Sequence, residues 1–123
     1  MIFHAQHIKG KGRGHTLGFP TINLEAPEDL ALDPGIYASW VVVRNKTYKG
    51  ALHYGPVPTF NEKEYTLEVY LLNITDETVP DTEGVDIEID VVKRLREIKN
   101  FANPEDLLHQ IAEDIKKVNA ILS

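Results

Sequence analysis

Four short segments rich in β-forming residues precede a single amphipathic helix, and this order constrains the fold more than any other feature of the chain. The segments span residues 36–43, 47–54, 65–72 and 85–91. They are rich in β-branched and aromatic residues or alternate between apolar and polar side chains, as half-buried strands do. Strands at such short spacing, followed by one helix, predict a mainly β fold, namely a small antiparallel barrel or sandwich closed by a terminal helix.

The last two segments alternate most clearly. In residues 65–72, one face carries Tyr65, Leu67, Val69 and Leu71, and the other carries Thr66, Glu68 and Tyr70. In residues 85–91, the polar face consists of Asp86, Glu88 and Asp90. We interpret these three acids as the solvated side of a half-buried strand and assign them no chemistry.

The helix has a clear start and one apolar stripe. Asn103 is a suitable N-cap, Pro104 suits the first helical position, and two acids follow at the positive end of the helix dipole. The stripe consists of Leu107, Leu108, Ile111, Ile115, Val118 and Leu122. A single stripe predicts that the helix lies on the barrel rather than between two partners.

The length and the absence of cysteine narrow the class of protein. The chain has 123 residues, so we expect one domain over residues 1–123. With no cysteine, a disulfide framework, a thiolate metal site and a cysteine nucleophile are excluded. No apolar run approaches the roughly 20 residues of a membrane span, and residues 1–10 lack a signal peptide. We therefore expect a cytoplasmic protein with no membrane partner.

Charge is unevenly distributed along the chain. The net charge of −6 argues against a nucleic-acid partner, which requires a basic surface. Before Glu25 there is no acid, whereas Lys9, Lys11 and Arg13 are present. A basic end on an acidic molecule could admit a small polyanion. A solvated surface whose charges simply fall unevenly explains the pattern equally well.

The basic end is also rich in glycine. Four of the eight glycines lie within nine residues, at Gly10, Gly12, Gly14 and Gly18. Glycine lets backbone N–H groups approach a phosphate closely. The segment matches neither the GxxxxGK[ST] nor the GxGxxG pattern. Taken alone, it is explained more simply as a flexible connection.

The residues that follow strengthen the case for a phosphate site. Pro20 favours an extended chain, in which Thr21 and Asn23 project from the same face. A hydroxyl and an amide oxygen are ligands that suit Mg²⁺, which takes its remaining ligands from water and substrate phosphates. The alternative is the polar edge of a strand or an Asx turn.

Five segments, in order, carry a recognisable signature. They are Gly12-Arg-Gly-His-Thr-Leu-Gly-Phe-Pro-Thr-Ile-Asn23, Gly35-Ile-Tyr-Ala38, Gly55-Pro-Val-Pro-Thr-Phe60, Leu67-Glu-Val-Tyr-Leu-Leu72 and Lys93-Arg-Leu-Arg-Glu-Ile-Lys-Asn-Phe101. Together they resemble the riboflavin kinases (flavokinases), which occur as the kinase domain of bifunctional bacterial FAD synthetases and as monofunctional eukaryotic enzymes. The resemblance covers nearly the whole chain.

This resemblance implies a fold and an activity. The fold would be a six-stranded antiparallel Greek-key closed barrel with a C-terminal α-helix. The activity would be transfer of the γ-phosphoryl group of ATP to the 5′-hydroxyl of riboflavin, which yields FMN and ADP and depends on Mg²⁺. We expect a monomer. Because the chain begins at the kinase barrel, we expect no FAD synthesis from it.

The resemblance also assigns roles to individual residues. Nucleotide phosphates would be bound by the first flap, formed by Gly12, Arg13, Gly14 and His15. Thr21 and Asn23 would bind Mg²⁺ and ATP phosphates, and Glu68 would be the catalytic base. The second flap, which borders the flavin, would include Arg96, Lys99 and Phe101. Glu68 also stands out as the one acid in an apolar or aromatic run, although alternation alone permits it on the outer face of a barrel.

Two departures from the family pattern keep a second hypothesis open. The family usually has Asn-Ile-Gly-x-Arg before Pro-Thr-Phe, but this chain has His53-Tyr-Gly-Pro-Val57. A customary asparagine and arginine are therefore missing at His53 and Val57. The alternative is a flavin- or nucleotide-binding barrel of the same fold with little or no kinase activity.

Overall fold

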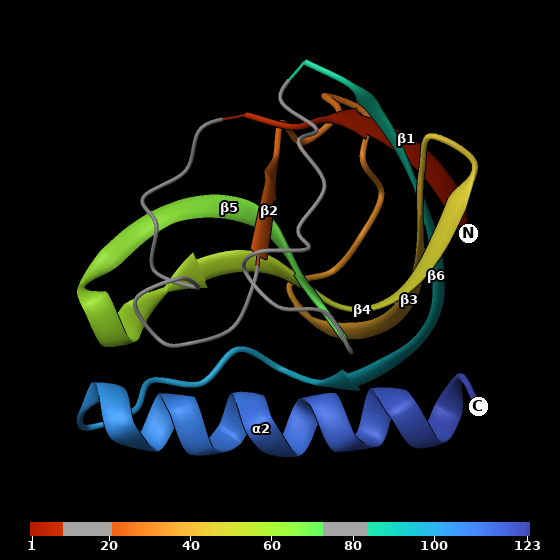
Figure 1. Ribbon diagram of the computed structural model, residues 1–123. Coiled ribbons are helices and arrows are strands. Elements are labelled where there is room, and N and C mark those ends of the chain that lie inside the picture. Colours follow the sequence, from red (N-terminus) through yellow and green to blue (C-terminus); the bar gives the residue numbers. More distant parts are fainter. Residues whose placement is uncertain (9–20, 73–83) are drawn as a thin grey trace.

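The computed structural model describes residues 1–8, 21–72 and 84–123. The described residues form six strands, one short 3₁₀ helix and one α-helix (Figure 1). In chain order these are β1 (Ile2–Gln6), β2 (Thr21–Leu24), β3 (Gly35–Val43), β4 (Lys46–Val57), η1 (Pro58–Phe60), β5 (Glu62–Leu71), β6 (Asp86–Arg96) and α2 (Pro104–Ile121).

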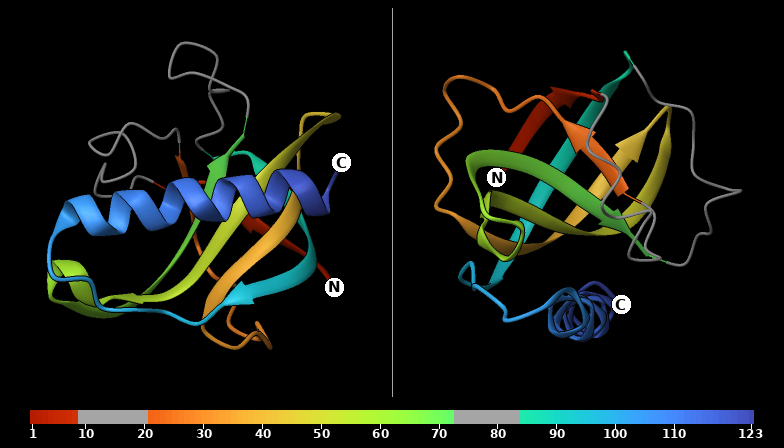
Figure 2. Two further views of the ribbon diagram at one scale, coloured as in Figure 1. Left: turned by 90° about the horizontal axis from the view of Figure 1, so that it is seen from below. Right: turned by 90° about the vertical axis from the view of Figure 1, so that its left-hand side faces the viewer.

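The six strands form one antiparallel sheet that curls back on itself. Their order across the sheet is β1-β6-β3-β4-β5-β2, and the curl is seen end-on in Figure 2. The two outermost strands meet at a bridge between His7 and Leu24. Nearby, the Ile8 amide donates to the Asn23 carbonyl oxygen at 2.8 Å. The predicted six-stranded antiparallel barrel with a C-terminal helix is confirmed.

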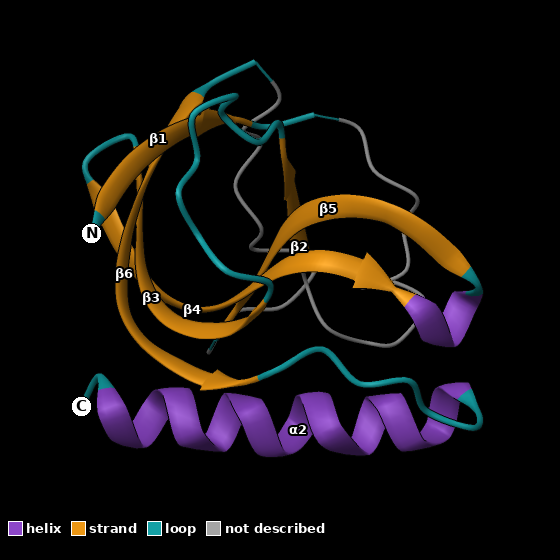
Figure 3. Cartoon of the chain, turned by 180° about the vertical axis from the view of Figure 1, so that it is seen from behind, coloured by secondary structure: helices purple, strands orange, loops and turns teal. Residues whose placement is uncertain are grey.

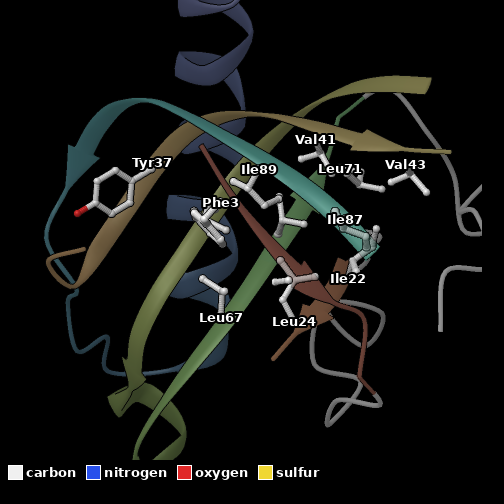
Figure 4. Packing of buried hydrophobic residues seen from close by; sticks show 13 residues of the cluster. Phe3, Ile22, Leu24, Tyr37, Val41, Val43, Leu67, Leu71, Ile87 and Ile89 are labelled. Carbon is white, nitrogen blue, oxygen red and sulfur yellow. The ribbon is translucent and has the colours of Figure 1, made fainter. Parts of the chain in front are cut away.

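Alternate residues of the strands fill the barrel interior with mostly aliphatic side chains (Figure 4). Leu67, Val69 and Leu71 of β5 point inward, as the alternation predicts. Tyr65, the fourth residue of the predicted inward face, is instead exposed. It packs edge-on against the ring of Tyr54 with the centroids 5.6 Å apart. The interior cluster consists of Phe3, Ala5, Ile22, Leu24, Tyr37, Val41, Val43, Leu52, Leu67, Val69, Leu71, Ile87 and Ile89.

Gly50 on β4 leaves the space that two interior valines occupy. A Cβ atom there would lie 2.6 Å from Val69 Cγ2 and 2.8 Å from Val41 Cγ2. We expect Gly50→Ala to lower the free energy of unfolding by about 1–3 kcal/mol through overpacking, measured by urea denaturation. Ser39 faces Gly50 across the strand pair, and among the described residues its buried hydroxyl has no hydrogen-bond partner. Ser39→Ala is therefore the matched control, with unchanged or higher stability; an unchanged midpoint for Gly50→Ala would contradict the prediction.

Strand β6 is longer than the alternation predicts, since it ends at Arg96 rather than at residue 91. Its pairing with β3 shifts register between Ile36 and Tyr37 and again between Ala38 and Ser39. Such bulges bend a strand and strengthen its twist. The final residues of β6 consequently reach α2.

Helix α2 lies across the outside of the barrel and contacts β3 and β4 (Figures 1 and 3). It begins as predicted, because the Asn103 side chain accepts a hydrogen bond of 2.9 Å from the Asp106 amide. Its apolar stripe packs in a second cluster that contains Ala38, Ala51, Leu72, Val118 and Leu122. In the described part of the chain, no helix is both long and apolar enough to cross a membrane.

Candidate active site

Three polar residues on neighbouring strands form one row on the outer face of the barrel. Glu68 on β5 is directly opposite Asn23 on β2 and, on its other side, directly opposite His53 on β4. Opposed residues of antiparallel strands point to the same side of the sheet, with Cβ atoms about 4.5–5.5 Å apart. Thr21 is opposite Tyr70, two residues along the same face. The register therefore brings Thr21, Asn23 and Glu68 together on one face.

Glu68 is buried although it points away from the barrel interior. Its neighbours Leu67 and Val69 occupy the interior, so the side chain between them lies on the outer face. Only 6% of Glu68 is exposed, and the residue lines a cleft to which α2 also contributes side chains. Burying a carboxylate is costly unless the group meets polar partners. Its position beside a cleft is therefore typical of a functional group.

The cleft lies between the barrel, α2 and the covering segment, which we define as residues 97–103 between β6 and α2. The space not occupied by atoms in and above the cleft is about 580 Å³, a volume that includes open solvent at its mouth. Its apolar walls include Ile36, Ala51, Pro56, Val57, Pro58, Ile98, Phe101, Leu107 and Ile111. Its polar lining consists of His53, Thr59, Glu68, Tyr70, Arg96, Lys99 and Asp114. Apolar walls with a few converging polar groups are typical of a small-molecule site.

The covering segment is fastened to the β4–η1 region at two points. The Phe101 amide donates to Thr59 Oγ1 at 3.0 Å. Ile98 packs against Gly55, where an added Cβ would lie 3.2 Å from Ile98 Cγ1. The φ angle of Gly55 is 135°, a value that side-chain-bearing residues rarely adopt. The glycine thus permits both the local backbone turn and the close approach of Ile98.

Removing the hydroxyl of Thr59 should loosen the covering segment. We expect the Phe101 amide of Thr59→Val to exchange with deuterium about 3–10-fold faster than in the wild type, since one hydrogen bond contributes about 1 kcal/mol. Exchange would be followed by NMR or by mass spectrometry of peptides. The Asp106 amide, which Asn103 caps, serves as an internal reference that should not change. Wild-type exchange at Phe101 would show that this bond does not hold the segment.

Arg96 lines the cleft, but its guanidinium group is bound by α2. Its Nη2 donates to Asp114 Oδ2 at 2.7 Å, and its Nε lies 3.0 Å from Asp114 Oδ1. The side chain of Arg96 is 11% exposed and that of Asp114 is 3% exposed. The Arg96 guanidinium carbon lies 5.9 Å from the centroid of the Phe101 ring.

The structure brings together most of the residues that the sequence singles out. Glu68, Arg96, Lys99 and Phe101 line one cleft. Thr21 and Asn23 do not line it, but they lie beside Glu68 through strand register. The first-flap residues 12–15 lie outside the described residues. The sequence reasoning missed Asp114 and Thr59, whose contacts depend on tertiary packing.

The Thr-x-Asn pair fits a magnesium ion that is bound together with phosphates. Thr21 and Asn23 are half-buried and offer neutral oxygen atoms on one face. The described residues contain no cluster of three or more His, Cys, Asp or Glu side chains that could hold a metal by themselves. Mg²⁺ commonly keeps several waters and shares its remaining coordination with substrate phosphates. The donor set therefore suits such an ion.

Comparisons with known proteins match this chain to riboflavin kinases. The family model "Flavokinase: Riboflavin kinase" matches residues 1–122. The chain is 34% identical over 111 residues to the bifunctional riboflavin kinase/FMN adenylyltransferase of Bacillus subtilis, covering 87% of this chain and 34% of that protein. It is also 34% identical over 112 residues to the RNA-binding riboflavin kinase RibR of the same organism, covering 90% of this chain and 46% of that protein.

A solved structure shares the fold. The crystal structure of riboflavin kinase from Trypanosoma brucei aligns with a TM-score of 0.67 and 21% identity, covering 98% of this chain and 78% of that one. The chain spans roughly a third to a half of the length of the two B. subtilis relatives. One of these relatives is RNA-binding by name, so the expected absence of a nucleic-acid partner stays a prediction. From the match over residues 1–122, the chain belongs to the riboflavin kinase family.

Proposed function

We propose that this chain is a riboflavin kinase that transfers the γ-phosphoryl group of ATP to the 5′-hydroxyl of riboflavin and releases FMN and ADP. The observation that carries the proposal is the position of Glu68. This buried carboxylate lines an apolar cleft and is the cross-strand neighbour of Asn23. An acceptor in the cleft and phosphates at the Thr-x-Asn pair would therefore meet at Glu68.

The lining of the cleft supports a flavin as the acceptor. Isoalloxazine is a flat ring system with an extended apolar face, and the cleft supplies aliphatic, proline and aromatic side chains. Lys99 and Phe101 lie in the lining contributed by the covering segment, which matches their proposed role in bordering the flavin. With the ring against these walls, the ribityl chain would extend toward Glu68.

Glu68 would act as the general base. As the 5′-oxygen of riboflavin forms its bond to the γ-phosphorus, the hydroxyl proton passes to the Glu68 carboxylate. The bond between the γ-phosphorus and the bridging oxygen breaks, and ADP leaves with that electron pair. Phosphoryl transfer requires mainly positioning and charge neutralisation, so a single well-placed carboxylate suffices for the proton.

The donor side would be held by neutral oxygen atoms and the glycine-rich segment. The Thr21 hydroxyl and the Asn23 amide oxygen would hold Mg²⁺ against the ATP phosphates. The bound ion supplies neutralisation of the charge on the transferred group. By motif position, residues 12–15 would cover the nucleotide, with Arg13 contributing a positive charge.

We propose that the enzyme acts in the cytoplasm, where ATP is available as the phosphoryl donor. We also propose that the enzyme acts as a monomer, as expected from the sequence.

The proposal is tested by incubating the protein with riboflavin, ATP and Mg²⁺ and separating the flavins by chromatography. FMN that forms only when all three are present is the expected result. Quenching of flavin fluorescence measures riboflavin binding in the same samples. Tight binding without FMN would instead support the non-catalytic barrel, a hypothesis that rests on the absence of the customary asparagine and arginine at His53 and Val57. If the protein neither binds riboflavin nor forms FMN, both hypotheses are refuted.

A further inference from the structure

The guanidinium group of Arg96 is engaged by the protein on all three nitrogen atoms. Nε donates to Asp114 Oδ1 at 3.0 Å and lies 3.1 Å from Oδ2, while Nη2 donates to Oδ2 at 2.7 Å. Nη1 donates to the Glu97 carbonyl oxygen at 3.0 Å. A forked, planar guanidinium on a carboxylate is the most geometrically specific of the side-chain ion pairs. These bonds use three of the five N–H groups of the guanidinium, one on each nitrogen atom, and they fix its orientation.

Asp114 binds this arginine and also accepts a hydrogen bond from a neighbouring residue of α2. It is 2% exposed and lies in the middle of the apolar stripe of α2, between Ile111 and Val118. Gln110, one turn earlier, donates from Nε2 to Asp114 Oδ1 at 3.1 Å. A carboxylate in this position is fixed in orientation by partners on two elements, α2 and β6.

The ion pair between Arg96 and Asp114 joins the end of β6, where the covering segment begins, to α2. Arg96 ends β6 and directly precedes the covering segment, whereas Asp114 belongs to α2. Both residues line the cleft, as does Phe101, whose ring lies beside the Arg96 guanidinium. A buried ion pair thus holds the start of the covering segment against α2, in addition to the contacts of that segment with Thr59 and Gly55.

We infer that Asp114 is a positioning residue for the flavin subsite, which acts through Arg96 by fixing the covering segment and its Phe101 ring against α2. The inference rests on the proposed function, since it assumes that this cleft binds the flavin. It gives Arg96 an indirect part in binding: the guanidinium orders the wall of the site and does not itself contact the ligand.

The test is a double-mutant cycle on riboflavin affinity, made with Asp114→Asn, Arg96→Lys and the combined variant. We expect each single change to raise the riboflavin Kd about 10-fold or more, because displaced walls misplace the ligand. If Arg96 acts only through Asp114, Arg96→Lys should change the Kd less than about 2-fold in the Asp114→Asn background. Additive effects would show that Arg96 contacts the ligand independently and would overturn the inference.

Kinetics separate positioning from a general loss of structure. We expect the KM for riboflavin to rise while the KM for ATP and the kcat at saturating riboflavin stay within about 3-fold of the wild type. The matched control is Glu113→Gln, which removes the same charge from the adjacent, exposed position where Glu113 pairs with Lys116 at 3.4 Å. It should leave both KM values unchanged. Equal changes in both KM values of Asp114→Asn would contradict a role in the flavin subsite.

Two further outcomes are distinguished. If Asp114→Asn does not fold, the paired change Arg96→Met with Asp114→Leu takes its place, because removing both charges together leaves none unpaired. Weakened riboflavin binding by this folded variant is expected, and wild-type affinity would overturn the inference. If the wild type does not bind riboflavin, the proposed function is refuted. If the wild type and Asp114→Asn bind riboflavin equally well, only the role of Asp114 is refuted.

Discussion

Replacing Glu68 with glutamine will lower the kcat of FMN formation by about 10²–10⁴-fold, the range that a positioned general base contributes. Glutamine keeps the shape of the side chain but cannot accept the proton of the riboflavin hydroxyl. The residue is buried beside the cleft, so water cannot readily take its place. Riboflavin affinity should stay within a few-fold of the wild type, because the apolar walls are unchanged. Turnover would be followed by chromatographic detection of FMN, and affinity by fluorescence quenching.

The same strand offers a matched control. Glu64 lies near the beginning of β5 and is exposed, so Glu64→Gln removes an identical charge away from the cleft. It should retain full activity. Activity of Glu68→Gln within a few-fold of the wild type would exclude Glu68 as the base, even if the protein proved to be a riboflavin kinase.

The second large effect concerns stability. Arg96→Ala should lower the free energy of unfolding by about 3–5 kcal/mol, because it leaves the Asp114 carboxylate buried without its cation. Asp114 is 2% exposed, and water therefore cannot compensate for the lost partner. Since domains are stable by only about 5–15 kcal/mol, the shift in urea or thermal denaturation should be large.

Two comparisons isolate the cause of this loss. The exposed pair between Lys116 and Glu113 is expected to contribute less than about 1 kcal/mol, so Lys116→Ala should hardly change the midpoint. Arg96→Met combined with Asp114→Leu should recover most of the stability lost in Arg96→Ala, because no charge stays unpaired. A loss below about 1 kcal/mol for Arg96→Ala would mean that the carboxylate reaches solvent or another partner.

The fold was largely predictable because its signals are local. Alternation in residues 65–72 predicts which side chains of β5 fill the barrel, and Asn103 with Pro104 predicts the start of α2. The length of β6 was not predictable in this way, since its bulges opposite Tyr37 and Ala38 arise from pairing with a distant strand. The exposure of Tyr65 likewise depends on what lies beside the strand, which periodicity does not reveal.

The types of residue in the site were predictable from the sequence, but the burial of these residues was not. Alternation puts Glu68 on the outer face of the barrel, whereas its burial to 6% exposure follows from tertiary packing, which alternation does not reveal. The signal for Asp114 was present in the sequence: an acid stands in a position of the helical stripe that its neighbours fill with apolar residues. Its partner, Arg96, lies 18 residues away and could be identified only from the structure.

Because the cleft lies outside the barrel, the strands encode two properties on alternate residues. In β5, Leu67 and Val69 build the hydrophobic interior, whereas Glu68 and Tyr70 border the cleft. Ligand preference can consequently diverge by substitution of one set while the other maintains folding. A library for altered acceptor choice should therefore randomise wall positions such as Ile36 and Val57, and leave the inward-facing half of each strand untouched.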